Sequence, residues 1–509
     1  GSRFSPSDQI TPDNVASLTP RWLFQHGVID GVSNQTTPVI VDGTMYVTDS
    51  RGSVYALNAV DGHLLWTYDV TRLLGGGRRE GYIFRHRGVA YDDGVVYTAA
   101  GSFMFALDAI TGEPLEGFGD NGQAPVILDV LHLKNPEIET AISAGYWFTT
   151  APQVYNGVIY VGTTRSESHI AGGYVLAIDS KTGEVLWNFN TVPQDETDQG
   201  WDIAGPTWVG NERNGGGIWE SPSIDPELGL VYVAVGNPYG DSTERDGMNL
   251  FSDSLIALTL DEGRLQWYYQ QVHHDVWDYD SGNQPILFDM EVDGQPVKAL
   301  AQANKNSWLY ILNRETGEPV HPIIETAVST ETDREGEQPY PTQPIPHNAS
   351  GVPMTPLCAT FVALSDPELA RRSSQLYTPY WVSKAVIVPH GGSSFGSPAF
   401  SPRTGLVYVT GKNGAIALVV NPVGDTLEPG PDSRGHTDSF SDLDRISEDY
   451  PPSVTVSAYD PVTGEQVWQR VLPARSSIGA SGNMVTAGNL VFQGVEDGGL
   501  YALDAETGE

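Results

Sequence analysis

The chain has 509 residues, of which 27 are basic and 64 are acidic, so its formal net charge is −37 at pH 7. Such a surface repels nucleic acid and anionic lipid, and we therefore exclude both as partners. No apolar run reaches the roughly 18 residues that a membrane-spanning helix needs. The single cysteine, Cys358, excludes an internal disulfide framework and a Cys-x-x-Cys-His haem attachment. The shortage of lysine fits either hydration in high salt or an exported protein from an arginine-preferring genome.

One phrase, Ala-x-Asp-x-x-Thr-Gly-x-x-x-Trp, recurs along the chain at intervals of roughly 40–80 residues, with varying completeness. Most copies follow an apolar run rich in Val, Tyr and Leu, and the glycine supplies the positive φ that a tight hairpin turn requires. The copies lie at residues 56–66, 106–112, 177–187, 257–267, 311–317, 406–420 (degenerate), 458–468 and 502–508. This pattern predicts an all-β chain, an eight-bladed β-propeller of four-stranded antiparallel blades, rather than a β-sandwich.

Three segments interrupt the repeats, at about residues 131–146, 326–381 and 424–453. Long loops on one rim of a propeller commonly form the entrance to a binding site. The third segment is acidic and could equally be a solvated surface loop without such a role. The last copy stops before its aromatic strand, and residues 20–24 (PRWLF) near the other end resemble that strand. We therefore expect the N- and C-terminal segments to pair and close the ring, so that residues 1–509 form a single domain without exposed sheet edges.

Five segments place polar or charged side chains in neighbourhoods that packing alone does not require. They read HHDVWDYD at 273–280, GNP at 236–238, TTRSE at 163–167, GGGIW at 215–219 and ANKN at 303–306. With the repeats, these segments resemble the eight-bladed propeller of the alcohol dehydrogenases that depend on pyrroloquinoline quinone (PQQ). The resemblance extends over about residues 10–509.

The resemblance implies that Asp278 is the catalytic base. An alcohol must lose its hydroxyl proton as hydride leaves the carbon, and a carboxylate within hydrogen-bond reach can accept that proton. The resemblance also implies that Glu167, Asn237 and Asp278 bind a metal ion, and their oxygen atoms are the hard ligands that suit an ion of the size of Ca²⁺.

Asp280 leaves the identity of the ion open. In the lanthanide-dependent branch of this family an Asp two residues after the base is an extra metal ligand, and a trivalent ion gains more from an added carboxylate than Ca²⁺ does. A similar Trp-Asp-x-Asp occurs in the membrane glucose dehydrogenase branch, which uses a divalent ion, and the flanks at 273–274 and 284–285 resemble that branch. We expect Ca²⁺, with a lanthanide ion as the alternative.

For the quinone, the resemblance implies that Trp219 stacks on the planar PQQ ring and that Lys305 lies beside its oxygens. A cation there stabilises the negative charge that develops on reduction. Further positions that match residues holding the PQQ carboxylates and carbonyls are Gln35, Arg87, Thr149 and Thr164. The sequence departs from the family at residues 81–82, where Gly-Tyr replaces an adjacent cysteine pair, and at 394–395, where Ser-Phe replaces Asn-Trp. The glucose dehydrogenase branch also lacks the cysteine pair.

The resemblance thus implies an exported, periplasmic or secreted dehydrogenase that depends on PQQ and a metal and oxidises an alcohol, sugar or polyol. Because the chain has no haem motif, electrons are expected to leave to a separate cytochrome c or quinone. The alternative is a non-catalytic propeller scaffold of the outer-membrane assembly type. Such a scaffold would keep the turns and packing aromatics without the metal and base residues.

Overall fold

The structure is a computed structural model. It describes residues 1–28, 34–70, 85–163, 172–356, 376–379, 381, 386–389, 392–394, 396–420, 436–438, 453–473, 481–495 and 498–509. The helices in this part of the chain are short: α1 (Val126–Leu131), α2 (Trp201–Ala204), and the 3-10 turns η1 (Val15–Ser17), η3 (Gly205–Thr207) and η4 (Ser242–Glu244). None of them has the length and hydropathy needed to span a lipid bilayer. The prediction of a mostly-β chain is confirmed.

Six sheets in the described residues have four strands each. The first three, each with its strands in spatial order, are the sheet of β2 (Val39–Val41), β3 (Thr44–Thr48), β4 (Val54–Asn58) and β5 (Leu64–Tyr68); the sheet of β6 (Ala90–Asp92), β7 (Val95–Ala100), β8 (Phe103–Asp108) and β9 (Gln123–Ala124); and the sheet of β10 (Gln153–Tyr155), β11 (Val158–Gly162), β12 (Tyr174–Asp179) and β13 (Val185–Asn190). The other three are the sheet of β15 (Ser223–Asp225), β16 (Leu230–Ala234), β18 (Ser254–Thr259) and β19 (Leu265–Gln270); the sheet of β26 (Ala399–Phe400), β27 (Val407–Asn413), β30 (Ser453–Tyr459) and β31 (Gln466–Pro473); and the sheet of β1 (Phe4–Ser5), β32 (Asn483–Thr486), β33 (Leu490–Gly494) and β34 (Leu500–Asp504). Five of these sheets are antiparallel throughout, as predicted, and the sixth is antiparallel except for its β1 edge.

Four smaller sheets complete the described β structure. Two have three strands: β20 (Ile286–Val292), β21 (Gln295–Ala303) and β22 (Leu309–Asn313), and β25 (Val386–Pro389), β28 (Ala415–Val420) and β29 (His436–Asp438). Two have two strands: β14 (Asn214–Gly215) with β17 (Pro238–Tyr239), and β23 (Ile323–Ala327) with β24 (Thr342–Pro346). The stretch 406–420, predicted as one degenerate repeat, is divided between β27 and β28, which belong to different sheets.

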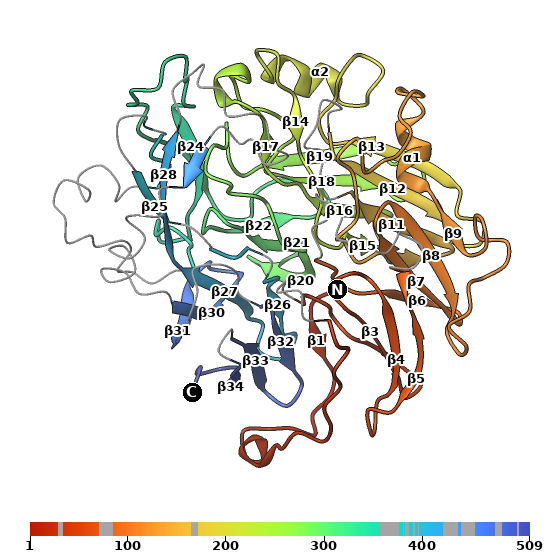
Figure 1. The fold of residues 1–509 in the computed structure, drawn as a ribbon. Coiled ribbons are helices and arrows are strands. Elements are labelled where there is room, and N and C mark those ends of the chain that lie inside the picture. Colours follow the sequence, from red (N-terminus) through yellow and green to blue (C-terminus); the bar gives the residue numbers. More distant parts are fainter. Residues whose placement is uncertain are drawn as a thin grey trace.

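The four-stranded sheets follow one another around the molecule in chain order (Figure 1). At the ends of the chain, β1 pairs in parallel with β32, so that Phe4 lies opposite Val485 and Ser5 opposite Thr486. The N-terminal segment therefore does pair with the last sheet. It does so through residues 4–5, whereas residues 20–24, which we expected to form the pairing strand, have no strand conformation.

A repeated contact between neighbouring sheets explains the repeat phrase. The Tyr46 hydroxyl and the Trp66 indole N–H both donate to the Ala109 carbonyl, each at 3.0 Å. Trp66 also covers Gly112 in the turn, where φ is +75° and a Cβ would lie 2.6 Å from the indole ring. The turn therefore requires glycine both for its backbone conformation and for the close approach of the indole.

The same arrangement recurs in other sheets. Equivalent Tyr–Trp pairs share one carbonyl at three further places: Tyr160 and Trp187 at Leu260, Tyr232 and Trp267 at Arg314, and Tyr408 and Trp468 at Ala505. Trp22 makes the equivalent contact near the N-terminus, because its indole donates to the Ala59 carbonyl at 3.2 Å and covers Gly62. Trp22 thus docks on the first sheet, and residues 20–24 do not supply the expected strand of the last one.

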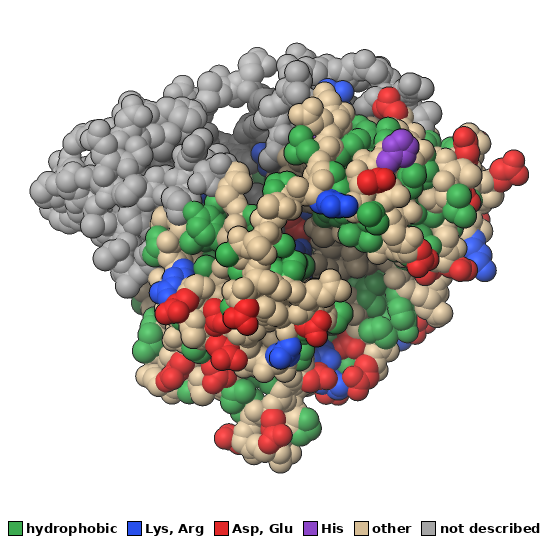
Figure 2. Space-filling view, turned by 90° about the horizontal axis from the view of Figure 1, so that it is seen from below, with side chains coloured by type: hydrophobic (Ala, Val, Ile, Leu, Met, Phe, Trp, Pro, Cys, Tyr) green, Lys and Arg blue, Asp and Glu red, His purple; other side chains and the backbone are tan. Residues whose placement is uncertain are grey.

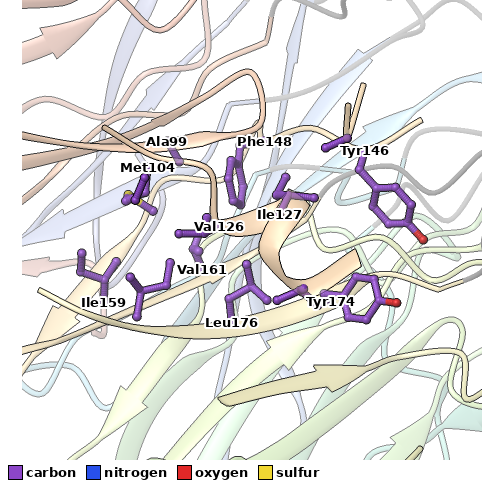
Figure 3. Close-up of a cluster of buried hydrophobic side chains, with 14 of the residues drawn as sticks. Ala99, Met104, Val126, Ile127, Tyr146, Phe148, Ile159, Val161, Tyr174 and Leu176 are labelled. Atoms are coloured by element: carbon purple, nitrogen blue, oxygen red, sulfur yellow. The ribbon is translucent and has the colours of Figure 1, made fainter. Parts of the chain in front are cut away.

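Apolar side chains fill the space between sheets. Figure 3 shows such a cluster, to which β8 contributes Met104, β11 contributes Ile159, and α1 contributes Val126 and Ile127. The predicted insertion at 131–146 begins and ends in this cluster, since Leu131 and Tyr146 are both buried. On the outside, acidic side chains spread over the described surface of the face in Figure 2, as the net charge requires.

Candidate functional site

The GGGIW and GNP segments lie side by side, which brings Trp219 next to Asn237. Strands β14 and β17 pair, and the backbone N–H of Gly216 donates to the Asn237 carbonyl at 2.9 Å. A Cβ on Gly215 would lie 2.4 Å from the same carbonyl. Glycine is therefore required here for the two backbones to approach each other.

Asp280 joins the GGGIW and GNP segments to the segment HHDVWDYD at 273–280, which carries the expected base and is called the base motif below. Its Oδ1 atom accepts hydrogen bonds from the backbone N–H of Asn237 at 2.9 Å and from the Trp219 indole at 3.3 Å. Its Oδ2 atom accepts from the Lys305 ammonium at 2.5 Å, and the residue is only 4% exposed. A Cβ on Gly236 would lie 2.6 Å from Oδ1. Asp280 is thus a central acceptor at which three of the predicted site residues meet.

Lys305 bridges the two carboxylates of the motif, because its ammonium also lies 2.9 Å from Oδ2 of Asp278. Burial acts to lower the pKa of Lys305, but the charges of Asp278 and Asp280 and their hydrogen bonds outweigh it and raise that pKa above its ordinary value. Lys305 is therefore a fixed positive charge. The Asp278 side chain keeps 21% of its surface exposed, so a small molecule can reach it.

Two cations lie close to the Trp219 ring. The Arg87 guanidinium carbon is 5.0 Å from the ring centroid, and the Lys305 ammonium is 5.6 Å from it, both within cation–π range. A Cβ on Gly282 would lie 2.3 Å from ring carbon Cζ2, so glycine is needed two residues after Asp280 to make room for the indole. The ring position is thus fixed from several sides.

Arg87 is held by Thr149, another residue expected to bind the quinone, and by a residue that the sequence did not reveal. Its Nη1 atom donates to the Thr149 hydroxyl at 2.7 Å, and its Nε atom lies 2.7 Å from the Glu220 carboxylate. Burial lowers the pKa of Arg87 and raises the pKa of Glu220, and each charge opposes the shift of the other. Glu220 follows Trp219 directly, in a glycine-rich segment. Because a buried carboxylate needs a cation beside it, this acid was the one feature of the sequence that could have indicated the contact with Arg87.

Two further carboxylates lie close to Asp280. Burial, together with the charges of Asp278 and Asp280, raises the pKa of Asp275 to about 7, although hydrogen bonds from two backbone N–H groups act to lower it. Burial and the neighbouring charges of Asp275 and Asp280 raise the pKa of Asp253 well above its ordinary value. At neutral pH this cluster therefore carries less negative charge than its number of carboxylates indicates.

The predicted insertion at 326–381 packs against the start of the base motif. The Gln343 side-chain amide pairs with the backbone of His273, accepting from its N–H at 2.9 Å and donating to its carbonyl at 2.8 Å. The imidazole Nε2 of His274 lies 3.0 Å from the buried Glu337 carboxylate. Burial acts to raise the pKa of Glu337, but the contacts with His274 and Arg334 outweigh it and hold that pKa at about 2.

Of the other predicted residues, Gln35 is half-buried and lies two residues before Thr37, whose backbone N–H donates to the Arg87 carbonyl at 2.9 Å. The segments that carry Gln35 and Arg87 therefore run side by side. Thr164 and Glu167 lie outside the described residues, as do the departures at 81–82 and at Phe395.

Within the described part of the chain, no three His, Cys, Asp or Glu residues are grouped so as to hold a metal ion. The predicted set does not require such a group, since it consists of Asp278, Asp280, the Asn237 amide and Glu167. Only the first two of these are acids within the described residues. The carboxylates of Asp278 and Asp280 both contact the Lys305 ammonium, at 2.9 and 2.5 Å respectively.

Comparison with known proteins identifies the family to which the chain belongs. A family model described as "PQQ: Glucose/ethanol/alcohol dehydrogenase, beta-propeller domain" matches residues 1–509. The chain is 31% identical over 533 residues to the quinohemoprotein alcohol dehydrogenase ADH-IIG of Pseudomonas putida, covering 100% of this chain and 66% of that protein. It is 30% identical over 532 residues to the quinohemoprotein alcohol dehydrogenase of Comamonas testosteroni, with 100% and 66% covered. The chain thus spans about two thirds of the length of these relatives.

Solved structures agree. The structure of the Pseudomonas putida enzyme ADHIIG has a TM-score of 0.76 at 29% identity, covering 100% of this chain and 70% of that chain. A europium-containing methanol dehydrogenase has a TM-score of 0.71 at 25% identity, covering 100% of this chain and 82% of that chain. Since the family model covers every residue, the chain belongs to the PQQ-dependent glucose/ethanol/alcohol dehydrogenase family of β-propeller proteins.

Proposed function

We propose that this protein is a PQQ- and metal-dependent dehydrogenase that oxidises an alcohol, a class that includes sugars and polyols, with Asp278 as the base. The observation that carries the proposal is the cluster in which Lys305 bridges Asp278 and Asp280 beside the Trp219 ring. The names of the relatives support alcohols as the substrate class, because they are alcohol dehydrogenases.

The described residues fit a planar, multiply charged quinone. Trp219 offers an aromatic face, Arg87 and Lys305 provide positive charge at 5.0 and 5.6 Å from its centre, and Gly282 leaves the space that the indole fills. We propose that Trp219, Arg87, Lys305 and Thr149 hold PQQ, together with Gln35 and Thr164. When bound, PQQ supplies the quinone that accepts the electron pair of the alcohol C–H bond.

For the metal we propose Asn237, Asp278, Asp280 and Glu167 as ligands. Their oxygen atoms form the hard donor set of a Ca²⁺-sized ion, which would polarise the quinone as a Lewis acid. We propose Ca²⁺ rather than a lanthanide, because the Asp280 oxygens already accept from Lys305, Trp219 and Asn237.

Asp278 is suited to accept a proton. Its carboxylate is partly exposed, and the Lys305 ammonium 2.9 Å away stabilises its ionised form. In the proposed reaction Asp278 takes the hydroxyl proton of the alcohol as the C–H electron pair leaves the carbon. Lys305, whose ammonium contacts the carboxylates of Asp278 and Asp280, would balance the negative charge that develops on the quinone oxygens beside it.

The molecular setting is part of the proposal. We propose a single domain over residues 1–509 in which eight blades form a ring closed by the N- and C-terminal segments. The contacts of β1 with β32 and of Trp22 with Gly62 support this closure. We further propose a periplasmic or secreted protein that transfers electrons to a separate cytochrome c or quinone.

The test is reconstitution of the purified protein with PQQ, alone and with Ca²⁺ or a lanthanide ion. We expect dye-linked alcohol oxidation only when quinone and metal are both present. We expect Asp278→Asn to lower turnover by about two orders of magnitude with the fold intact by circular dichroism. The scaffold alternative predicts neither quinone binding nor activity, and activity without added quinone in quinone-free protein would contradict the proposal.

A further inference from the structure

The backbone of the proposed base adopts an unusual conformation. Asp278 has a φ of +65°, in the left-handed region that side chains other than glycine seldom adopt. Holding a non-glycine residue there costs about 1 kcal/mol or more, so neighbouring contacts must maintain it. Because φ at Asp278 determines the direction of its side chain, these contacts also determine where the proposed base lies.

Asp275 supplies contacts on both sides of Asp278. Its Oδ1 atom accepts from the backbone N–H of Trp277 at 2.7 Å, and its Oδ2 atom accepts from the backbone N–H of Tyr279 at 2.7 Å. Hydrogen bonds from N–H to a carboxylate are stronger than those between neutral groups. One carboxylate therefore brackets the residue that the mechanism uses.

The bracket is itself fixed in place. Asp275 is only 1% exposed, and its backbone carbonyl accepts from Nη2 of the buried Arg245 at 2.7 Å. Nη1 of Arg245 donates to the Asn249 side chain at 2.8 Å. On the other side, the rings of Trp277 and Tyr279 stack with centroids 5.6 Å apart and an interplanar angle of 23°. The loop thus has little freedom to place Asp278 elsewhere.

We infer that Asp275 is a positioning residue for the reaction: its carboxylate holds the backbone of Asp278 in the left-handed conformation that directs the base towards Lys305. This inference rests on the proposed function of Asp278. Asp275 acts only through Asp278, so its loss should impair turnover without impairing the quinone site at Trp219.

The decisive variant is Asp275→Asn, which keeps one acceptor oxygen and turns the other into an NH₂ donor facing a backbone N–H. Assays at about pH 8 keep the wild-type carboxylate ionised, because the pKa of Asp275 is about 7. We expect kcat to fall about tenfold or more, since small misplacements of a catalytic group are costly. KM for the alcohol and the Kd of PQQ, measured by equilibrium dialysis, should change less than about threefold.

A double variant tests whether Asp275 acts only through Asp278. If Asp275 acts only through Asp278, then Asp275→Asn combined with Asp278→Asn should be no slower than Asp278→Asn alone. An unchanged kcat in Asp275→Asn, additive losses in the double variant, or a lost affinity for PQQ would each overturn the inference. Wild-type turnover in Asp278→Asn would instead overturn the proposed function, so the two failures are distinct.

Asp225→Asn is the matched control. Asp225 is also a buried aspartate whose Oδ1 accepts two backbone N–H groups, from Glu227 at 3.0 Å and Leu228 at 3.2 Å, in a turn that carries no proposed site residue. It should lower thermal stability without lowering kcat of the folded enzyme. If Asp275→Asn does not fold, Arg245→Lys tests the same contacts, because the single nitrogen of lysine cannot occupy the positions of both guanidinium nitrogens, which contact Asn249 and the Asp275 carbonyl. It should lower kcat without additivity to Asp278→Asn, and an unchanged kcat would again overturn the inference.

Discussion

Lys305 determines how the carboxylates around it behave. Its ammonium lies within 2.9 Å of both Asp278 and Asp280, and without it two acids would face each other in a mostly buried site. The two acids nevertheless have different surroundings, since Asp278 is partly exposed whereas Asp280 is buried and hydrogen-bonded to Trp219 and the Asn237 backbone. This difference suits a base that meets substrate and a carboxylate that orders the pocket.

Asp280→Asn separates the charge of this residue from its hydrogen bonds, because the amide oxygen can still accept from Trp219 and Asn237. With Ca²⁺ as the proposed ion, we expect PQQ and Ca²⁺ to activate the wild type and lanthanides to add nothing. Asp280→Asn should retain most of its quinone affinity, whereas Asp280→Ala should lose about tenfold as the indole loses its acceptor. Metal titrations of both variants provide the measurement. A lanthanide preference that is present in the wild type and absent in Asp280→Asn would identify Asp280 as the selecting ligand instead.

At the scale of elements, the repeated hairpins and the insertions have separate tasks. The turn glycines and the recurring tryptophans are fixed by residue type and spacing, so the sequence predicted the hairpins, whereas the Tyr–Trp contacts between sheets emerge from the structure. The insertion at 326–381 has no such repeat, and its packing against His273 and His274 depends on single long-range contacts such as Gln343 and Glu337. A polar residue that meets its partner tens of residues away leaves no periodic signal in the sequence.

The same reason explains what was missed in the site. Trp219, Lys305 and Asp278 were predicted from local motifs, and the structure brings them together. Glu220 was not predicted, because a lone acid does not reveal which buried cation it pairs with. The strand expected at 20–24 was wrong, because its aromatic pattern reflects the docking of Trp22 on Gly62 and not strand pairing.

The Glu337 contact predicts a pH-dependent stability of this insertion. The folded pKa of Glu337 is about 2, below its usual value, so its contribution is fully present above about pH 5 and is lost as the pH falls towards 2. Glu337→Gln should therefore destabilise the protein by about 2 kcal/mol at pH 7, and the difference from wild type should shrink below about pH 4. Urea denaturation of both proteins across this range is the measurement. A difference that stays constant down to about pH 3 would show that the carboxylate charge plays no part.

For the whole molecule, order around the ring comes from contacts that repeat between consecutive sheets. Each Tyr–Trp pair ties an inner strand, which carries the Tyr, and an outer strand, which carries the Trp, to the turn of the next sheet, as Trp66 does at Gly112 and Trp468 at Gly508. β1 adds the chain start to the edge of the last sheet through Phe4 and Ser5. The pairing of β1 with β32 covers one edge of the last sheet, so along that edge the backbone groups of residues 485–486 are not free to pair with another molecule.

If the ring closes as we propose, Trp22 should contribute as much to stability as the tryptophans that join consecutive sheets. Trp22 and Trp66 are both half-buried, donate to a carbonyl at 3.2 and 3.0 Å, and cover a glycine whose Cβ would lie 2.6 Å from the ring. Trp22→Ala and Trp66→Ala should each lower the free energy of unfolding by about 2–3 kcal/mol, and unfolding should remain a single transition in both. Calorimetry and urea denaturation measure these changes. If the N-terminal segment were only an appendage, Trp22→Ala would cost less than about 0.5 kcal/mol while Trp66→Ala kept its full effect, because a surface contact outside the ring adds little to the cooperative unit.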